Sequence, residues 1–378
     1  MSRVQITLLV AAVAGVLVAP VAAQDDTAPW LPLPEGEMSR VAWGSCSNQY
    51  LAKPIWKALA TAAPDLFLYQ GDIIYGDAAP PGTRILDLSI DQLAKMKMDY
   101  QFLSTHPDFI AVKNKIPVMA TWDDHDYGKN DGGADFELKE QSRELLFDFL
   151  DVPADSERRL RPGVYDARIF GPPGRRVQVI MLDTRYFRSP LVRGTLTKEE
   201  AAAQNIVGRY VPNIDTNTTM LGEAQWQWLE DQLRLPAGVR LLNSSIQVVA
   251  GEKGAESWGN LPHERQRLYD LIRSTRANGV IILSGDVHYA EFSKSDEGPY
   301  PLYDFTSSPL AQYPTGSAGW ETCVNSFRIS ETFVQDNFGL VEIDWQAKPS
   351  PTIAVMVIGI DGSSHMRFEI SLDHLQGK

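Results

Sequence analysis

The sequence is poor in cysteine and lacks the glycine motifs of several common enzyme folds. Only Cys46 and Cys323 occur in 378 residues, which excludes a small fold held by several disulfides. Neither G-x-G-x-x-G nor G-x-x-x-x-G-K-[ST] is present, so a dinucleotide site or a P-loop is not predicted. The G-x-S-x-G nucleophile elbow is absent too. Composition alone allows either one Cys46–Cys323 bridge or two free thiols.

Positive charge is also scarce. The net charge is -13, which argues against the broad basic surface that nucleic-acid binding requires. Hydrophobic residues make up 44% of the chain and charged residues 22%, as in ordinary globular proteins of one large domain or two smaller ones. A local site for a cation remains compatible with this acidic balance.

The N-terminal segment predicts export. It has a single Arg3, an apolar stretch from Leu8 to Ala23, and small residues before Gln24, which together are typical of a secretory signal over residues 1–23. A retained membrane anchor is the alternative, but the stretch is shorter than the roughly 20 residues of a spanning helix. No twin-arginine pair is present. We expect a periplasmic or extracellular protein without a stable membrane span.

Short apolar runs alternate with helical patterns along the rest of the chain. Strand-like runs cover residues 41–46, 65–72, 116–124, 177–185, 239–249 and 279–288. Amphipathic helices are predicted over 53–63, 89–103, 135–150, 222–233 and 262–274. This order indicates an α/β fold. We expect a proline-rich arm over 24–37 and a single domain over 38–378, in which the strands of 300–378 complete a second sheet. Residues 188–221 form either an insertion over the site or a surface excursion.

Polar clusters follow the strand-like runs at the points where they end. They are Ser45-Cys46-Ser47-Asn48, Gly71-Asp72, Trp122-Asp123-Asp124-His125, Thr184-Arg185 and Gly285-Asp286-Val287-His288. In α/β sheets, ligands bind outside the carboxyl ends of the strands, so we expect these clusters to converge. Each cluster by itself is equally compatible with a turn or a helix cap.

The converging residues offer metal ligands of mixed chemistry. Cys46, Asp72, Asp124, Asp286 and His288 supply a thiol, carboxylates and an imidazole, and Tyr75 could add a phenolate. This number of sulfur, oxygen and nitrogen ligands suits more than one metal ion. Two cations would also offset the repulsion among the carboxylates, which at about 4 Å reaches roughly 4 kcal/mol per pair at an effective dielectric of about 20. The spacing after Asp124 does not fit a calcium-binding EF-hand loop.

The set of motifs in order, "GSC", "QGDIIYGD", "TWDDHD", "LDTR" and "LSGDVH", resembles the alkaline phosphatase D (PhoD-like) family of calcineurin-like metallophosphoesterases. The resemblance covers roughly residues 40–345. It implies an α/β/β/α sandwich of two mixed sheets flanked by helices. It also implies Fe³⁺ held by Cys46, Asp72, Tyr75 and His288. Ca²⁺ would be shared through Asp72 and held by Asp124 and Asp286, in a dinuclear or trinuclear site; Zn²⁺ and Mn²⁺ fit this ligand set less well.

The expected activity is hydrolysis of phosphoric esters by in-line attack of a metal-bound hydroxide. His125 would act as general acid toward the leaving oxygen, with Asp126 or Asp123 orienting its ring. Arg185 would either clamp a phosphate oxygen or pair with a nearby Asp. Among substrate contacts we expect Asn48 and, in the pocket wall, Trp258.

The sequence leaves the substrate open among phosphate monoesters, diesters and lipid headgroups, and it leaves the oligomeric state open. A glycoside hydrolase with paired carboxylates and a catalytically silent calcium-binding protein are alternatives from other classes. The first gives no role to Cys46 or to the Asp-Val-His triplet. The second gives no role to His125.

Overall fold

The computed structural model describes residues 29–78, 91–312 and 319–377. The expected signal segment, residues 1–23, lies outside these ranges and stays a prediction, while residues 29–37 of the expected arm form no regular element. Within the described ranges, no helix combines the length and the apolar character needed to cross a bilayer.

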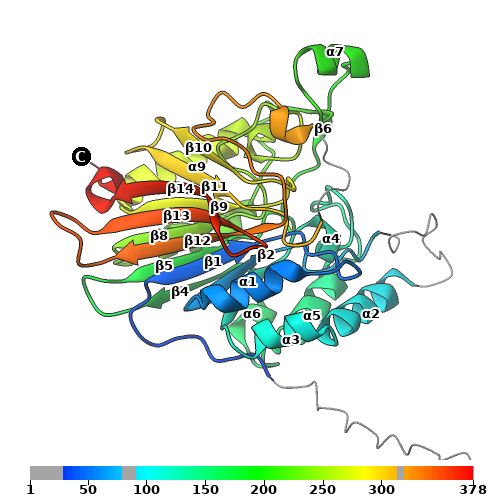
Figure 1. Cartoon of the computed structure of the whole chain (residues 1–378). Coiled ribbons are helices and arrows are strands. Elements are labelled where there is room, and N and C mark those ends of the chain that lie inside the picture. Colours follow the sequence, from blue (N-terminus) through cyan, green and yellow to red (C-terminus); the bar gives the residue numbers. More distant parts are fainter. Residues whose placement is uncertain (1–28, 79–90, 313–318, 378) are drawn as a thin grey trace, which may run out of the picture.

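Two six-stranded mixed sheets form the centre of the structure (Figure 1). The first sheet has the order β14-β13-β12-β1-β2-β3, with β1, β2 and β3 parallel. Its strands are β1 (Arg40–Gly44), β2 (Leu66–Gln70), β3 (Val118–Thr121), β12 (Asn337–Asp344), β13 (Thr352–Gly359) and β14 (Ser364–Ser371).

The second sheet has the order β10-β11-β9-β8-β5-β4, and its central strands β11, β9, β8 and β5 are parallel. Its strands are β4 (Asp166–Phe170), β5 (Val177–Met181), β8 (Val239–Asn243), β9 (Val280–Ser284), β10 (Glu291–Ser295) and β11 (Leu302–Thr306). A separate short pair joins β6 (Val192–Arg193) to β7 (Tyr210–Val211).

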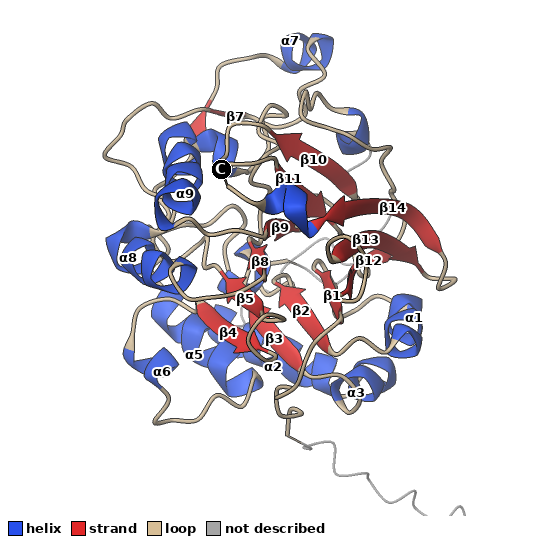
Figure 2. Ribbon diagram, turned by 90° about the vertical axis from the view of Figure 1, so that its left-hand side faces the viewer, coloured by secondary structure: helices blue, strands red, loops and turns tan. Residues whose placement is uncertain are grey.

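Helices cover the two outer faces, with α8 and α9 on one side and α1 and α3 on the other (Figure 2). The α-helices are α1 (Pro54–Ala62), α2 (Gln92–Ser104), α3 (Pro107–Lys113), α4 (Asp124–Tyr127), α5 (Lys139–Phe149), α6 (Glu157–Leu160), α7 (Lys198–Ala203), α8 (Gly222–Leu233) and α9 (Pro262–Thr275). Short 3₁₀ turns are η1 (Trp258–Asn260), η2 (Trp320–Thr322) and η3 (Leu372–Leu375). The predicted α/β/β/α sandwich of two mixed sheets is confirmed.

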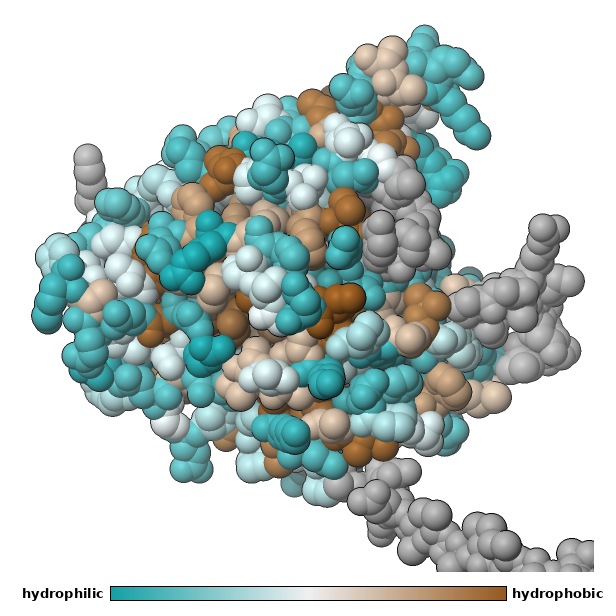
Figure 3. All heavy atoms as spheres, in the orientation of Figure 1, coloured by the Kyte–Doolittle hydropathy of each residue, from teal (hydrophilic) through white to brown (hydrophobic). Residues whose placement is uncertain are grey.

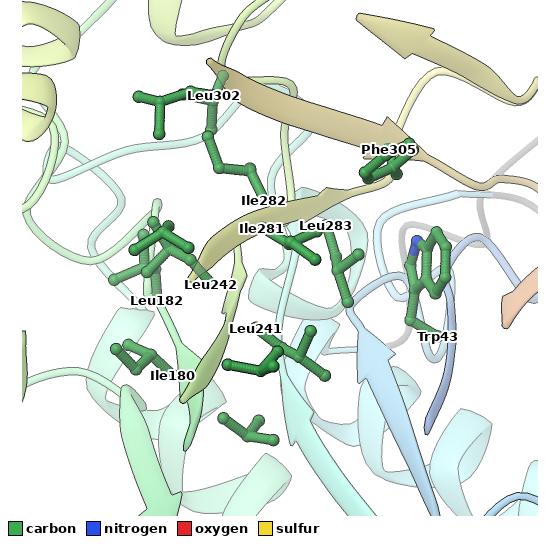
Figure 4. Packing of buried hydrophobic residues seen from close by; sticks show 14 of the residues in the cluster. Trp43, Ile180, Leu182, Leu241, Leu242, Ile281, Ile282, Leu283, Leu302 and Phe305 are labelled. Carbon is green, nitrogen blue, oxygen red and sulfur yellow. The ribbon is translucent and has the colours of Figure 1, made fainter. Parts of the chain in front are cut away.

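Strand alternation explains how one sequence fills both layers. In β2, Leu66 and Leu68 belong to the core cluster between the sheets, whereas Phe67 and Tyr69 belong to the cluster under α1, α2, α3 and α5. This is the two-residue period of a strand with two covered faces. The inter-sheet layer also takes in Trp43 and Leu283, seen in Figure 4. The paired sheets thereby fix the strand ends that carry the polar clusters.

The strands of the C-terminal part extend both sheets rather than one. β12, β13 and β14 continue the first sheet from β1, while β11 lies in the second sheet beside β9. We predicted that residues 300–378 complete a second sheet; their strands instead divide between the two sheets. Residues 188–221 contain β6, α7 and β7, and α7 projects from the body of the molecule (Figure 1).

Lys53, the residue before α1, has an unusually buried amino group. Its side chain is 1% exposed, and its Nζ donates to the Asn48 carbonyl oxygen. Burial lowers the pKa of Lys53 to about 7, although the negative charge of Asp336 opposes the shift. The folded state therefore prefers the neutral amine across a pH range in which the unfolded chain keeps the proton.

This difference predicts a pH-dependent stability. Between the folded pKa and the unfolded value of about 10.4, the unfolded state binds more protons, so stability rises with pH by up to about 1.4 kcal/mol per unit. Denaturant unfolding of the wild type and Lys53→Met at pH 7, 8 and 9 measures the effect. The wild type should gain stability relative to the variant as pH rises. A difference that stays constant over this range would contradict the assignment.

Candidate metal centre

The carboxyl ends of the parallel strands in both sheets meet at one edge, and two glycines allow the close approach. A Cβ on Gly71, after β2, would lie 2.2 Å from the backbone N of Asp123. A Cβ on Gly285, after β9, would lie 2.3 Å from Ser45 Oγ, which follows β1 in the other sheet. Any side chain at these positions would force the strand ends apart. The glycine before each Asp is therefore a packing requirement.

Four of the predicted ligands have left-handed backbone conformations. The φ angles are 59° for Cys46, 50° for Asp72, 73° for Asp286 and 61° for His288. Such angles are uncommon for residues with a side chain, and they cluster where the surrounding structure holds a functional group in place. The backbone thus turns sharply at each strand end and directs these side chains into one cluster.

The first group of candidate ligands combines sulfur, oxygen and nitrogen. Cys46 Sγ donates to Asp72 Oδ2 at 3.4 Å, and ligand atoms of Cys46, Asp72 and His288 lie within 4.8 Å of one another. The Tyr75 hydroxyl lies 3.2 Å from His288 Nε2. Both cysteines are free thiols in the structure. These contacts bring the four residues predicted for the first metal together.

The second group consists of carboxylates. Oxygens of Asp123, Asp124 and Asp286 lie within 4.8 Å of one another, and Asp72 also approaches Asp124. Asp124 Oδ2 accepts from the backbone N of Asp131 at 2.8 Å. Asp124 Oδ1 and Asp123 Oδ2 are buried and have no hydrogen-bond partner. Buried carboxylate oxygens without partners are strongly unfavourable unless a cation or a donor faces them.

The protonation behaviour of these groups fits a cation-binding role. Burial raises the pKa of the Cys46 thiol, and the charges of Asp72 and Asp286 raise it further. Burial likewise raises the pKa of the Asp72 and Asp286 carboxyls. A bound cation would offset this desolvation and favour the anionic ligands. The donor set and the unpartnered oxygens therefore fit a pair of metal ions.

His125 lies beside the acidic cluster, but its orienting partner is not the predicted one. Its Nδ1 is 2.6 Å from Asp77 Oδ1, and its ring packs against Tyr75 with centroids 4.2 Å apart and the planes tilted by 30°. The prediction that Asp126 or Asp123 orients this ring is wrong. Although burial opposes the charged form, the carboxylates of Asp124, Asp72 and Asp77 raise the pKa of His125 well above its ordinary value.

Asp126 instead holds two backbone segments together. Its Oδ1 accepts from the backbone N of Asp72 at 3.2 Å and of Asp123 at 2.6 Å, and its Oδ2 accepts from Ile73 N at 3.2 Å. These bonds tie the end of β2 to the first turn of α4, where Asp126 is part of a capping box. Its carboxylate is fully buried, and the hydrogen bonds that it accepts come from the backbone and not from the His125 ring.

Arg185 pairs with protein carboxylates. Of its two predicted roles, phosphate binding or pairing with a nearby Asp, the structure shows the pairing. It is fully buried, its Nε donates to Asp123 Oδ1 at 2.6 Å, and its Nη1 lies 2.6 Å from Glu256 Oε2. Arg188 pairs with the same Glu256. The chain of Asp123, Arg185, Glu256 and Arg188 balances charge directly behind the cluster. The prediction that Arg185 clamps a phosphate would require breaking this network.

The two predicted substrate contacts have different outcomes. Trp258 is 0% exposed, packs in the core against Trp226, and donates through Nε1 to Ser244 Oγ at 3.0 Å. Its assignment to a pocket wall is wrong, because a side chain with no exposed surface cannot touch a substrate. Asn48 lies on the loop after β1, and its Oδ1 accepts from Tyr50 N at 3.1 Å. Its contact with a substrate stays a prediction.

Three residues near the cluster were not predicted from the sequence. Asp77 is the second acidic residue of the "GDIIYGD" motif, so its proximity to Asp72 was a usable signal. Glu256 and Asp131 stand in loops without a strand-end pattern. Ligand atoms of Asp124, Asp131 and Glu256 lie within 4.8 Å of one another, a contact between distant segments that no local pattern encodes.

Two mixed sheets with thiol, imidazole and carboxylate groups at their shared edge define a candidate metal-binding α/β protein. A family model described as a PhoD-like phosphatase matches residues 41–352. The chain belongs to the PhoD-like phosphatase family, and the resemblance seen in the motifs is confirmed.

Two individual relatives agree with this membership. Alkaline phosphatase D of Bacillus subtilis (strain 168) is 23% identical over 286 residues, which make up 68% of this chain and 47% of that protein. The chain thus spans about half the length of this curated relative. A solved structure described as "Structure of PhoD" aligns with a TM-score of 0.63 at 19% identity, over 90% of this chain and 73% of that one. The structural likeness supports the fold.

The geometry around Cys46 predicts different roles for the two cysteines. Cys46→Ser should lower bound metal, because it would replace a candidate soft ligand next to Asp72 and His288, whereas Cys323→Ser should leave the metal content unchanged. Elemental analysis of both purified variants, together with the visible absorption expected of a ferric thiolate or phenolate, measures this. A Cys46–Cys323 disulfide found by mass spectrometry in active protein would overturn the assignment.

Proposed function

We propose that the protein is a metal-dependent phosphoesterase that hydrolyses phosphate monoesters or diesters. The observation that carries the proposal is the convergence of Cys46, Asp72 and His288 with Asp124 and Asp286 at the meeting edge of the two sheets. Membership of the PhoD-like phosphatase family supports the same reaction. Lipid headgroups remain within the proposed substrates, because their esters present the same phosphoryl chemistry.

The ligand chemistry supports two different ions. Cys46, Asp72, Tyr75 and His288 would hold Fe³⁺, since thiolate, phenolate and imidazole suit a transition metal. Asp124 and Asp286, with Asp72 shared, would hold Ca²⁺, which prefers carboxylate oxygens. When bound, such a pair of cations lowers the pKa of a coordinated water and neutralises charge on a phosphoryl group.

The protein residues around this site support hydrolysis in a single displacement. Water loses a proton to solvent and its oxygen forms a bond to phosphorus in line with the leaving ester oxygen, while the bond to that leaving oxygen breaks. His125 donates a proton from the ring nitrogen that Asp77 does not engage, Nε2, to the leaving oxygen. Asp77 is a positioning residue, because its bond to Nδ1 fixes the orientation of the ring.

The buried charges behind the site serve its geometry. Arg185 does not transfer a proton. It holds Asp123 and Glu256 in place through ion pairs. Asp126 keeps the ends of β2 and β3 together through backbone N–H groups. Such supporting contacts orient the groups that bind metal and substrate. The signal-like segment over residues 1–23 supports export to the periplasm or the extracellular space.

The proposal predicts metal-dependent hydrolysis of p-nitrophenyl phosphate at alkaline pH. A strong chelator should abolish the activity, and added Ca²⁺ should restore it while iron stays bound. Activity is followed with metal content measured on the same samples. Full activity in a preparation free of both metals would refute metal dependence, and the absence of hydrolysis of any phosphate ester by metal-loaded protein would refute the activity itself.

The His125–Asp77 pair predicts a dependence on the leaving group. His125→Ala should slow hydrolysis of alkyl phosphates by about 10²- to 10⁴-fold, the range for loss of a general acid. The effect on p-nitrophenyl phosphate should be much smaller, because its leaving group needs no proton. Asp77→Asn should show the same leaving-group pattern to a lesser degree.

Metal content separates this role from ligation. Both variants should retain the wild-type metal content, whereas Asp124→Ala should lose metal because it removes a ligand and leaves the neighbouring carboxylates repelling one another. Equal slowing on both classes of substrate, or metal loss in His125→Ala, would identify His125 as a ligand and overturn its assignment as general acid.

A further inference from the structure

Residues 207–210 of the 188–221 segment are fixed to the rim of the candidate metal centre by backbone hydrogen bonds. Val207 N and Gly208 N donate to the Lys253 carbonyl oxygen at 3.1 and 3.0 Å, and Tyr210 N donates to the Gly254 oxygen at 2.8 Å. A Cβ on Gly208 would lie 1.8 Å from the same Gly254 oxygen, so only glycine permits this approach. Arg209 therefore has a backbone that is anchored on both sides.

The anchor brings Arg209 next to the acidic cluster through Asp131. Tyr210 OH donates to Asp131 Oδ2 at 2.5 Å, and the backbone N of Asp131 donates to Asp124 Oδ2 at 2.8 Å. Arg209 Nη2 lies 4.0 Å from Asp131 Oδ2, and its side chain is 58% exposed. Arg209 is thus linked to the candidate metal ligand Asp124 through Asp131, and its side chain is exposed to solvent.

Other cations near the cluster are already held by carboxylates. Arg185 and Arg188 are buried against Glu256, and Lys129 pairs with Asp135 at 2.7 Å. By contrast, the 4.0 Å pair of Arg209 is too long for a hydrogen bond. An exposed ion pair of this length contributes little stability. Its guanidinium therefore keeps donors that can bind another anion.

We propose that Arg209 binds a second anionic group of the substrate, so that the preferred substrates are phosphate esters that also carry a carboxylate or another phosphate. This inference rests on the proposed phosphoesterase function. The phosphoryl group would lie at the acidic cluster, and the rest of the substrate would extend past Asp131 toward the 188–221 segment. A guanidinium suits this role because it donates two parallel hydrogen bonds to a carboxylate or phosphate.

The part of the segment beyond the anchor extends away from the site. Its helix α7 projects from the body of the molecule (Figure 1), and the face of it seen in Figure 3 carries both hydrophilic and apolar residues. Because the residues on both sides of Arg209 are hydrogen-bonded to Lys253 and Gly254, a bound anion would meet a side chain with a fixed backbone. The preference would therefore depend on Arg209 rather than on the net charge of the segment.

The test uses two phosphonates of similar length that cannot be hydrolysed, 3-phosphonopropanoate and butylphosphonate, which differ in the terminal carboxylate. Calorimetric binding to metal-loaded protein should give a roughly 5- to 10-fold preference for the carboxylated probe in the wild type, as expected of one exposed charge-assisted contact. Arg209→Ala should lose the preference without losing affinity for butylphosphonate. Arg209→Lys should retain part of the preference, because the positive charge remains while the two parallel N–H donors of the guanidinium are lost.

Arg193 provides the matched control. It lies on β6 opposite Tyr210 in the same short strand pair and is exposed, so Arg193→Ala removes the same charge from the same segment. This variant should keep the wild-type preference. A wild type without preference, or an Arg209→Ala protein that retains it, would overturn the inference while hydrolysis of simple esters stands. Failure of wild-type protein to bind either phosphonate or to hydrolyse any ester would overturn the proposed function and the inference with it.

Discussion

Buried negative charge at the meeting edge of the two sheets is the constraint on which the rest of this structure depends. Parallel strands from both sheets end there, and the segments after β1, β2, β3 and β9 bring Cys46, Asp72, Asp124 and Asp286 into one largely buried cluster. Charges in such a place are stable only when they are paired, hydrogen-bonded or bound to a cation. The glycines before Asp72 and Asp286, and the left-handed backbone at these residues, are the conformational means by which the side chains meet.

The protein balances its buried carboxylates in three ways, and the differences assign their roles. Asp123 and Glu256 are paired with arginines. Asp126 is held by backbone N–H groups. Asp72 and Asp124 each accept one backbone N–H, but Asp72 also lies against the Cys46 thiol and Asp124, and Asp124 lies against Asp286. The first two solutions belong to a rigid support, and the third is the arrangement that metal ions would complete.

Sequence patterns predicted the layers and identified most of the residues that the structure brings together as candidate metal ligands, because both depend on local signals. Apolar runs fixed β2 and β9, and the ends of those runs identified Asp72, Asp286 and His288. β4 and β10 were missed, since their alternation with charged residues does not stand out from loops. Asp126 was misassigned because its neighbour in sequence, His125, turns away toward Asp77, a contact across 48 positions. Trp258 was misassigned because an aromatic residue suits a pocket wall and a core equally well.

The most direct test of this account is anomalous diffraction at the iron edge from crystals of active, metal-loaded protein. The account predicts an iron peak bonded to Cys46 Sγ, Asp72, Tyr75 and His288, and a separate calcium position bonded to Asp72, Asp124 and Asp286. Active crystals with no metal at the shared edge of the sheets, or with metal bound elsewhere and Cys46 unligated, would contradict it.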